Sequence, residues 1–288
     1  MRISRRGFLG TAGMAAGIGA GMSAVLPDLG ATAAAQTGDT AIAVEKNVVF
    51  GKGGEMDLKL DIYKPPAGTG KRMATVHVHG GGFTGGSKDT LNERILPFAR
   101  RGYVAIAAQY RLAGQAKWPS QIEDVKAAIR WTRANAGMLG INPDRIAVVG
   151  YSAGGLLALN VAGMQDPQVA ACAAFYAVTD EPGPILPEGL DAAARRATTP
   201  ATNISARFAP TVFFHGVADT TVPIESSQTF FQMLRDAKVT TELHTFAGAP
   251  HIFDQVPEFA SASALMFDLF VDRYVINPRN PFAAQRRG

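Results

Sequence analysis

A serine set between glycines is the residue in this chain best suited to nucleophilic chemistry. Gly150-Tyr151-Ser152-Ala153-Gly154 follows the apolar run Ile146–Val149 and opens the apolar segment Ala153–Gly163, which predicts a turn from strand to helix. Such a turn exposes the hydroxyl, and the start of the helix offers free N–H groups and partial positive charge to a developing oxyanion. The alternative is structural, with Ser152 serving only to cap the helix.

A serine hydroxyl is a weak nucleophile unless a base lies beside it, so a histidine must follow. Of the histidines downstream of Ser152, His251 lies in a loop just after the last predicted strand, which is where the base belongs. His244 lies inside a predicted strand, which favours a packing role. His215 precedes the favoured acids, against the order serine, acid, histidine that accompanies the Gly-x-Ser-x-Gly motif. The sequence therefore predicts His251 as the base.

The acid that orients this histidine is expected on a loop at a strand end, between Ser152 and His251. Asp219 satisfies that condition, since it follows the predicted strand Thr211–Phe214. A buried carboxylate there fixes the imidazole tautomer and stabilises the imidazolium. Three competing aspartates are less well placed, because two belong to an irregular insert and one to a helix; they are Asp180, Asp191 and Asp236.

A glycine-rich loop supplies a third element of the predicted site. His79-Gly80-Gly81-Gly82-Phe83 follows the apolar strand that ends near His79. Without side chains, its backbone can approach a tetrahedral intermediate, and we expect Gly81, Gly82 and Ala153 to donate their N–H groups to the oxyanion. A phosphate-binding loop is disfavoured, because no Lys-Ser or Lys-Thr pair follows in the arrangement of a P-loop.

Taken together, these motifs with Asp219 and His251 resemble the α/β-hydrolase superfamily. The likeness is to its serine esterase and lipase branch, which includes hormone-sensitive-lipase-like and bacterial feruloyl-esterase-like enzymes, and it covers about residues 43–275. It implies a mostly parallel sheet with helices on both faces, and no metal or organic cofactor. The chain departs from capped lipases, because the insert at residues 178–209 is too short for a long helical cap.

The pattern of apolar runs predicts the same α/β architecture. Compact apolar runs are typical of strands covered on both faces, and their alternation with helical segments predicts a parallel sheet whose carboxyl ends carry the site. The predicted strands are Ala43–Phe50, Leu58–Tyr63, Ala74–His79, Tyr103–Ala108, Ile146–Val149, Val169–Tyr176, Thr211–Phe214 and Thr240–Phe246. The predicted helices are Ile95–Arg101, Ser120–Asn135, Ala153–Gly163, Ile224–Ala237 and Phe259–Tyr274.

The first 35 residues have the composition of an export signal rather than of the fold. A basic start, an apolar middle and the small-residue site Ala33-Ala34-Ala35 predict cleavage before Gln36, which leaves residues 36–288 as the hydrolase domain. Ser4-Arg5-Arg6-Gly7-Phe8-Leu9 resembles the twin-arginine motif, so a periplasmic or secreted location is expected through that export machinery.

Replacing Arg5 and Arg6 with lysine tests the expected export route, because the precursor should then remain in the cytoplasm.

Composition excludes several other classes of function. The net charge is +4 over 288 residues, and the predicted signal holds three arginines and one aspartate, so little positive charge belongs to the mature chain. No long basic run supports nucleic-acid binding, and no membrane span is expected in the mature chain. One cysteine, Cys172, rules out an intramolecular disulfide.

The sequence therefore predicts a serine carboxylic-ester hydrolase acting through an acyl-enzyme, on short-acyl esters of small molecules, sugars or polymers. Two alternatives stay open: an amide, formamide or peptide hydrolase using the same triad, and an inactive binding protein with this fold. Phe83, Trp118, Tyr151 and the insert at 178–209 are candidates for the pocket wall or for packing.

Overall fold

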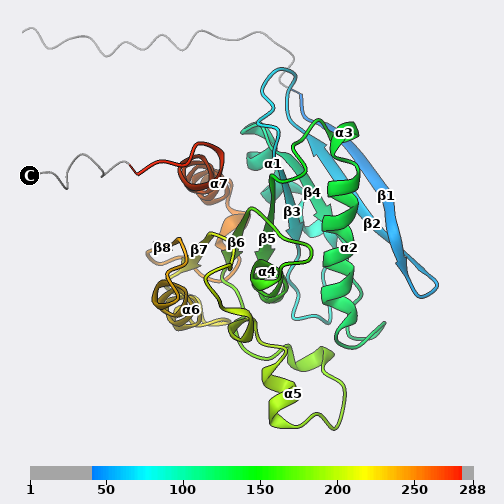
Figure 1. Cartoon of the computed structure of the whole chain (residues 1–288), viewed down its shortest axis with the longest axis vertical. Coiled ribbons are helices and arrows are strands. Elements are labelled where there is room, and N and C mark those ends of the chain that lie inside the picture. The colour runs from blue at the N-terminus through cyan, green and yellow to red at the C-terminus, as the bar shows by residue number, and fades with distance from the viewer. Residues whose placement is uncertain (1–40, 281–288) are drawn as a thin grey trace, which may run out of the picture. The chain divides into compact units, whose positions relative to one another are not determined.

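A computed structural model describes residues 41–280, so the predicted export signal and the last eight residues lie outside the described part of the chain. Eight strands form one sheet (Figure 1). They are β1 (Ala43–Gly53), β2 (Met56–Lys64), β3 (Ala74–Val78), β4 (Val104–Ala108), β5 (Ile146–Tyr151), β6 (Ala171–Phe175), β7 (Thr211–Gly216) and β8 (Thr241–Phe246).

The order of the strands confirms the predicted α/β class. They run β1-β2-β4-β3-β5-β6-β7-β8 across the sheet. β1 pairs antiparallel with β2, and β2 pairs antiparallel with β4, whereas every other neighbouring pair is parallel. β3, β4, β5, β6 and β7 are buried at every position, as the continuous apolar runs predicted.

Helices cover both faces of the sheet (Figure 1). α1 (Asn92–Arg100) and α7 (Pro257–Val271) pack together on one face. The opposite face carries α2 (Ser120–Ala134), α4 (Ala153–Gly163) and α6 (Ile224–Asp236). The short helix α3 (Ala136–Leu139) extends α2, and the insert contributes α5 (Ala192–Arg196), which Figure 1 shows away from the sheet.

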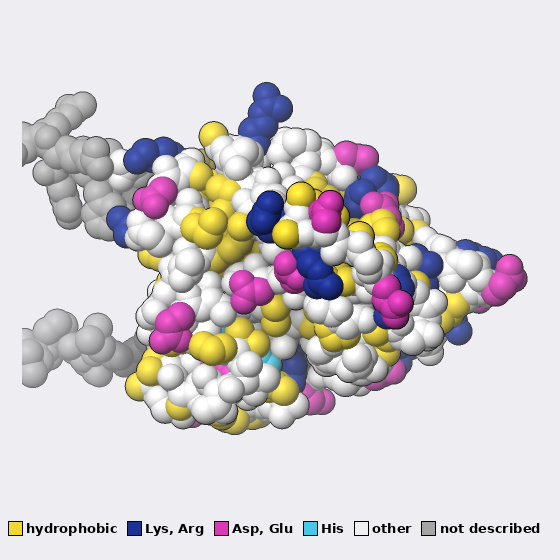
Figure 2. All heavy atoms as spheres, turned by 90° about the horizontal axis from the view of Figure 1, so that it is seen from below, with side chains coloured by type: hydrophobic (Ala, Val, Ile, Leu, Met, Phe, Trp, Pro, Cys, Tyr) yellow, Lys and Arg dark blue, Asp and Glu magenta, His cyan; other side chains and the backbone are white. Residues whose placement is uncertain are grey.

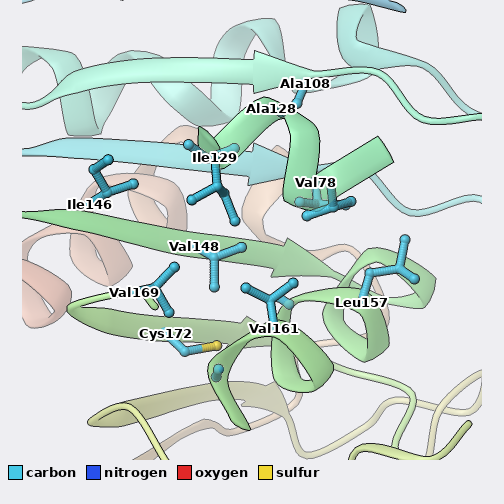
Figure 3. Packing of buried hydrophobic residues seen from close by; sticks show 14 of the residues in the cluster. Val78, Ala108, Ala128, Ile129, Ile146, Val148, Leu157, Val161, Val169 and Cys172 are labelled. Atoms are coloured by element: carbon cyan, nitrogen blue, oxygen red, sulfur yellow. The ribbon is translucent and has the colours of Figure 1, made fainter. Parts of the chain in front are cut away.

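One core cluster lies between the sheet and the second set of helices. Figure 3 shows Val78 of β3 and Val148 of β5 facing Ile129 of α2 and Val161 of α4. Cys172, the single cysteine, is buried in the same cluster as a free thiol. A close-packed apolar layer of this kind holds the strands rigidly, and with them the loops that follow the strands.

Most predicted elements are present, and the differences lie at their ends. The strand predicted at Ile146–Val149 continues to Tyr151, because Tyr151 pairs with Phe175 of β6. The last helix begins earlier than predicted, since Pro257 occupies its first turn, where a missing N–H costs nothing. It then ends at Val271 and passes into a short π-helix, Asp272–Ile276. Within residues 41–280, no helix has the length and apolarity needed to span a bilayer.

A buried histidine in the centre of the sheet makes stability depend on pH. His77 of β3 is fully buried, with its ring nitrogens hydrogen-bonded to the hydroxyls of Tyr151 (3.0 Å) and Thr75 (2.9 Å). Burial lowers its pKa to about 3. Because the unfolded chain binds a proton near the ordinary histidine pKa and the folded chain does not, the contribution is complete above about pH 6.5 and is lost as the pH falls.

We expect His77→Gln to flatten the acid side of the stability profile. Glutamine keeps hydrogen-bonding capacity and cannot be protonated, so the variant should lose about 2 kcal/mol less than the wild type between pH 7.5 and pH 5. Denaturant unfolding at the two pH values measures this difference. An identical pH dependence in the two proteins would contradict the assignment of His77 as a buried, neutral group.

Candidate active site

The backbone at Ser152 adopts a conformation that few side chains tolerate. Its φ is 53° and its ψ is −118°, between the end of β5 and the start of α4. Such a conformation costs about 1–3 kcal/mol and persists only where its surroundings enforce it. The N–H of Ser152 donates to the carbonyl of Phe175 (3.0 Å), and its own carbonyl accepts from Gly155 (2.9 Å) and Val178 (3.2 Å). The strained turn is thereby fixed to neighbouring β6.

The glycines on either side of the turn are required by close contacts. A Cβ at Gly150 would lie 2.3 Å from the carbonyl oxygen of Gly154, and one at Gly154 would lie 2.2 Å from that of Val78. No real Cβ approaches backbone that closely, so a larger residue at either position displaces the turn. The same absence of side chains lets the start of α4 press against the end of β3, where the glycine-rich loop begins.

The structure brings Ser152, His251 and Asp219 into one hydrogen-bonded chain. Nε2 of His251 lies 3.0 Å from Oγ of Ser152, and Nδ1 lies 2.7 Å from Oδ2 of Asp219. Ser152 follows β5, Asp219 follows β7 and His251 follows β8, so the carboxyl ends of these strands position the three residues. The Ser152 side chain makes no capping hydrogen bond to α4, which removes the purely structural reading of this serine.

Asp219 is held as an ionised acceptor. Its side chain is buried, and Oδ1 accepts the N–H groups of Thr221 and Val222, both at 2.9 Å. Burial raises the pKa of Asp219, but the hydrogen bonds from His251, Val222 and Thr221 outweigh burial and leave that pKa below its ordinary value. A charged, immobilised carboxylate of this kind sets the orientation and the tautomer of the imidazole.

The two competing histidines lie away from the serine. His215 is buried and its Nε2 lies 3.3 Å from Asp219, but its ring nitrogens already bond to Oγ of Ser227 (2.7 Å) and to the carbonyl of Val222 (2.9 Å). His215 therefore packs against the carboxylate of Asp219, a contact that the sequence did not predict. His244 lies on β8, stacks on Phe214 and contacts Glu242.

The competing aspartates are also elsewhere. Asp180 is exposed, and Asp191 caps α5 by accepting the N–H of Ala194 (2.8 Å). Asp236 accepts from Gln232 at the end of α6. None of these carboxylates contacts His251, so among the described residues Asp219 is the carboxylate hydrogen-bonded to that ring.

The glycine-rich loop lies beside the serine. A Cβ at Gly80 would lie 3.0 Å from Cβ of Ser152, which shows how near the loop runs to the nucleophile. Gly81 and Gly82 have φ values of 114° and 60°, and their N–H groups donate to no other residue in the range 41–280. Ala153 is the first residue of α4, where N–H groups have no acceptor within the helix. The three expected donors therefore remain available to a ligand.

Buried polar contacts hold this loop in place. The hydroxyl of Tyr110 donates to the carbonyl of His79 (3.0 Å), and the two rings stack with centroids 4.2 Å apart. Burial lowers the pKa of His79 to about 4, so its ring is neutral at physiological pH. At the far end of the loop, the buried ammonium of Lys88 lies 2.9 Å from the buried carboxylate of Asp61 on β2.

Comparison with known proteins finds hydrolase families and esterases among the relatives of this chain. The family model named BD-FAE matches residues 60–180, and the model of the prolyl oligopeptidase family matches residues 186–274. Among solved structures, Thermogutta terrifontis esterase 2 phosphoramylated by tabun has 31% sequence identity and a TM-score of 0.71, over 83% of this chain and 97% of that one. The chain belongs to the α/β-hydrolase esterases, in their hormone-sensitive-lipase-like branch.

Two curated relatives of this α/β-hydrolase come from Mycobacterium tuberculosis. The probable carboxylic ester hydrolase LipM is 29% identical over 247 residues, which are 74% of this chain and 57% of LipM. The carboxylesterase NlhH is 38% identical over 119 residues, which are 40% of this chain and 36% of NlhH. The matched part therefore spans little more than half of LipM and about a third of NlhH.

A cavity of about 480 Å³ opens onto Ser152 and His251 in this α/β-hydrolase. Of the three aromatic residues that the sequence suggested for the pocket, Tyr151 lines the wall. Phe83 and Trp118 pack in the core cluster or against it instead. The insert contributes Val178 alone to the wall. The wall residues are Gly80, Gly81, Gly82, Gly86, Thr90, Arg94, Tyr151, Ser152, Tyr176, Val178, Thr221, Val222, His251, Ile252 and Gln255.

Sequence reasoning missed several of these wall residues. Tyr176 directly follows β6, so the rule that strand ends carry the site would have found it. Gln255 shares a loop with His251. Arg94 gave no usable signal, because an arginine in the first turn of a helix is ordinarily solvated.

The described residues 41–280 offer no metal site, and the face that Figure 2 shows is not dominated by one sign of charge. In residues 41–280, no cluster of three or more His, Cys, Asp or Glu side chains is placed to hold a metal ion. Figure 2 shows the face on the side of α5, where acidic, basic and hydrophobic side chains are interspersed. Neither sign of charge dominates that face, so long-range steering of a charged polymer has no basis there.

We expect Asp219→Asn to lower kcat by roughly 10⁴-fold while leaving the protein folded, because an amide favours the wrong imidazole tautomer. Asp180→Asn is the matched control, since Asp180 is exposed and outside the chain of hydrogen bonds. Steady-state ester hydrolysis and circular dichroism of both variants check this. Comparable activity in the two variants would remove Asp219 from the site.

Proposed function

We propose that this protein is a serine carboxylic-ester hydrolase that forms an acyl-enzyme at Ser152. The observation that carries the proposal is the hydrogen-bonded chain from Ser152 through His251 to Asp219, beside the free N–H groups of Gly81 and Gly82. A nucleophile, a base, a group that orients the base and oxyanion donors are the parts that acyl transfer requires. The named esterases among its relatives support the same reaction.

In the first half-reaction, Oγ of Ser152 attacks the ester carbonyl carbon and passes its proton to Nε2 of His251. The carbonyl oxygen becomes an oxyanion that accepts hydrogen bonds from Gly81, Gly82 and Ala153. The tetrahedral intermediate then collapses, the C–O bond to the alcohol breaks, and the alcohol leaves with the proton from His251. Asp219 stays ionised and stabilises the imidazolium throughout.

In the second half-reaction, His251 takes a proton from water, and the resulting nucleophile attacks the acyl carbon of the ester on Ser152. The second tetrahedral intermediate expels Oγ, which regains its proton from His251. One ester and one water are thereby converted into one acid and one alcohol, and the enzyme is restored. Losing one oxyanion donor typically costs about 3 kcal/mol of barrier, so the glycine-rich loop is expected to contribute substantially to the rate.

Short acyl groups are the proposed substrates. The insert forms no long lid helix, because α5 covers only Ala192–Arg196, and Val178 alone from this region reaches the cavity wall. Structures of Thermogutta terrifontis esterase 2 are known with propionate and with butyrate bound, which supports short chains in a related site. The alcohol is a small molecule, a sugar or a polymer hydroxyl.

Amide or peptide hydrolysis is a second candidate, and the match of residues 186–274 to the prolyl oligopeptidase family favours it. The same triad can protonate a leaving amine. Turnover of an ester and of its matching anilide separates the two activities, since an enzyme built for esters should discriminate strongly against the anilide. Comparable kcat/KM for both would favour the amide hydrolase.

We expect Ser152→Ala to fold normally and to lose roughly 10⁶-fold in kcat, because the members of a triad act as a unit. A fluorophosphonate probe should label the wild type at Ser152 and leave the variant unlabelled, as detected by mass spectrometry of peptides. Wild-type protein that neither reacts with the probe nor hydrolyses any ester would instead identify an inactive binding protein with this fold.

We expect kcat/KM to be highest between acetyl and butyryl esters. Methylenes beyond the cavity remain in water and forgo the roughly 0.8 kcal/mol that each gains on burial. A series of 4-nitrophenyl esters from two to sixteen acyl carbons measures this. A maximum at ten carbons or more, or activation at an oil–water interface, would contradict the short-acyl assignment.

A further inference from the structure

A buried arginine forms part of the cavity wall. Arg94 lies in the first turns of α1, and its side chain is only 8% exposed. It lines the same cavity as Ser152 and His251. Among the described residues of the wall, it carries the only guanidinium or ammonium group, and no wall residue carries a carboxylate. The cavity therefore presents one fixed positive charge to whatever occupies it.

The hydrogen-bonding groups of this arginine are largely unused within the protein. Its Nε has no hydrogen-bond partner, and Nη1 reaches the hydroxyl of Tyr176 at 3.5 Å, the outer limit of such a bond. The guanidinium also lies over the ring of Tyr151, 5.8 Å from the centroid. A guanidinium carries five N–H donors, and leaving buried donors unpaired is costly. The guanidinium therefore has donors that an acceptor in the cavity could use.

The nearest carboxylate does not satisfy this need. Oδ2 of Asp254 lies 3.6 Å from Nε of Arg94, beyond hydrogen-bonding distance, and Oδ2 itself has no partner. The other oxygen of Asp254 accepts the hydroxyl of Tyr176 at 2.5 Å. Burial raises the pKa of Asp254 despite the opposing effects of Arg94 and Tyr176. Asp254, which does not line the cavity, thus holds the wall residues Arg94 and Tyr176 in position. It leaves donors of the Arg94 guanidinium unpaired.

We infer that Arg94 binds a carboxylate on the substrate, so that the preferred substrates are esters carrying a carboxylate near the scissile bond. The inference rests on the proposed ester hydrolase function. A planar guanidinium matches the two oxygens of a carboxylate, and charge-assisted hydrogen bonds are strong where water is excluded. Thr90 and Gln255 line the cavity as exposed residues, whereas Arg94 is buried, so the charged group of the substrate lies in the deeper part.

Two pairs of esters test the inference and show which side of the substrate carries the carboxylate. For the acyl side, mono-4-nitrophenyl glutarate is compared with 4-nitrophenyl pentanoate, which has an acyl chain of equal length. For the alcohol side, 3-acetoxybenzoate is compared with 3-methylphenyl acetate. After subtraction of uncatalysed hydrolysis, we expect kcat/KM for one anionic ester to exceed that of its neutral partner by about tenfold or more, as a charged hydrogen bond allows.

Variants of α1 assign the preference to Arg94. In Arg94→Met, the ratio of anionic to neutral kcat/KM should fall at least about tenfold, because a thioether offers no charged donor. Arg94→Lys should keep part of the preference, since it retains the charge without the planar fork. Arg100→Met is the matched control, because Arg100 lies on the same helix, is exposed and is absent from the cavity wall. Its ratio should equal that of the wild type.

The outcomes separate this inference from the proposed function. Turnover of neutral esters with no anionic preference in either pair would overturn the role of Arg94 and leave the esterase intact. A preference that survives in Arg94→Met would place the anion site elsewhere and would also overturn it. Failure of folded wild-type protein to hydrolyse any of the four esters would count against the proposed function itself. If Arg94→Met does not fold, the wild-type ratios and Arg94→Lys still decide the question.

Discussion

The strained turn at Ser152 is the constraint on which the rest of the site depends. A φ of 53° at a residue with a side chain is unfavourable, and the hydrogen bond to Phe175 and the contacts of Gly150 and Gly154 enforce it. Because the turn is fixed to β6 and pressed against the end of β3, the hydroxyl, the helix start and the glycine-rich loop occupy fixed relative positions. Preorganised donors of this kind need no rearrangement when charge develops during the reaction.

Many of the buried polar groups near this turn have hydrogen-bond partners, although Nε2 of His79, Nε of Arg94 and Oδ2 of Asp254 have none. Asp219 receives hydrogen bonds from the backbone and from His251, and Nε2 of His215 lies 3.3 Å from the same carboxylate oxygen that contacts His251. Two buried pairs behave differently. Lys88 and Asp61 are in direct contact and fasten the loop to β2. In the other pair, Nε of Arg94 lies 3.6 Å from Oδ2 of Asp254, and neither atom has a hydrogen-bond partner. The satisfied ion pair serves the architecture, and the unsatisfied one beside the cavity is the observation from which we infer a binding role for Arg94.

The sheet explains why residues far apart in the chain meet. Ser152, Asp219 and His251 follow strands that lie at the centre and toward one edge of the sheet, in the order β5, β6, β7, β8. Parallel strands present their carboxyl ends together, so loops of a few residues suffice to bring the side chains into hydrogen-bonding distance. The small insert leaves the cavity bounded mainly by these loops, and the wall therefore takes its chemistry from strand ends and from the first turns of α1.

The sequence by itself predicted the class of fold and the serine, histidine and aspartate that lie in one hydrogen-bonded chain, because glycine spacing and apolar runs respond to local backbone requirements. The ends of elements were predicted less accurately than their existence. In β5, pairing with β6 extends the strand beyond the predicted end, Val149, to Tyr151. Only the tertiary structure decided the positions and contacts of four further residues near the site, His215, Tyr176, Asp254 and Arg94. Whether an arginine in a first helical turn is solvated or buried depends on what packs against it. Here its neighbours are Tyr151, Tyr176 and Asp254, and no local pattern encodes those contacts.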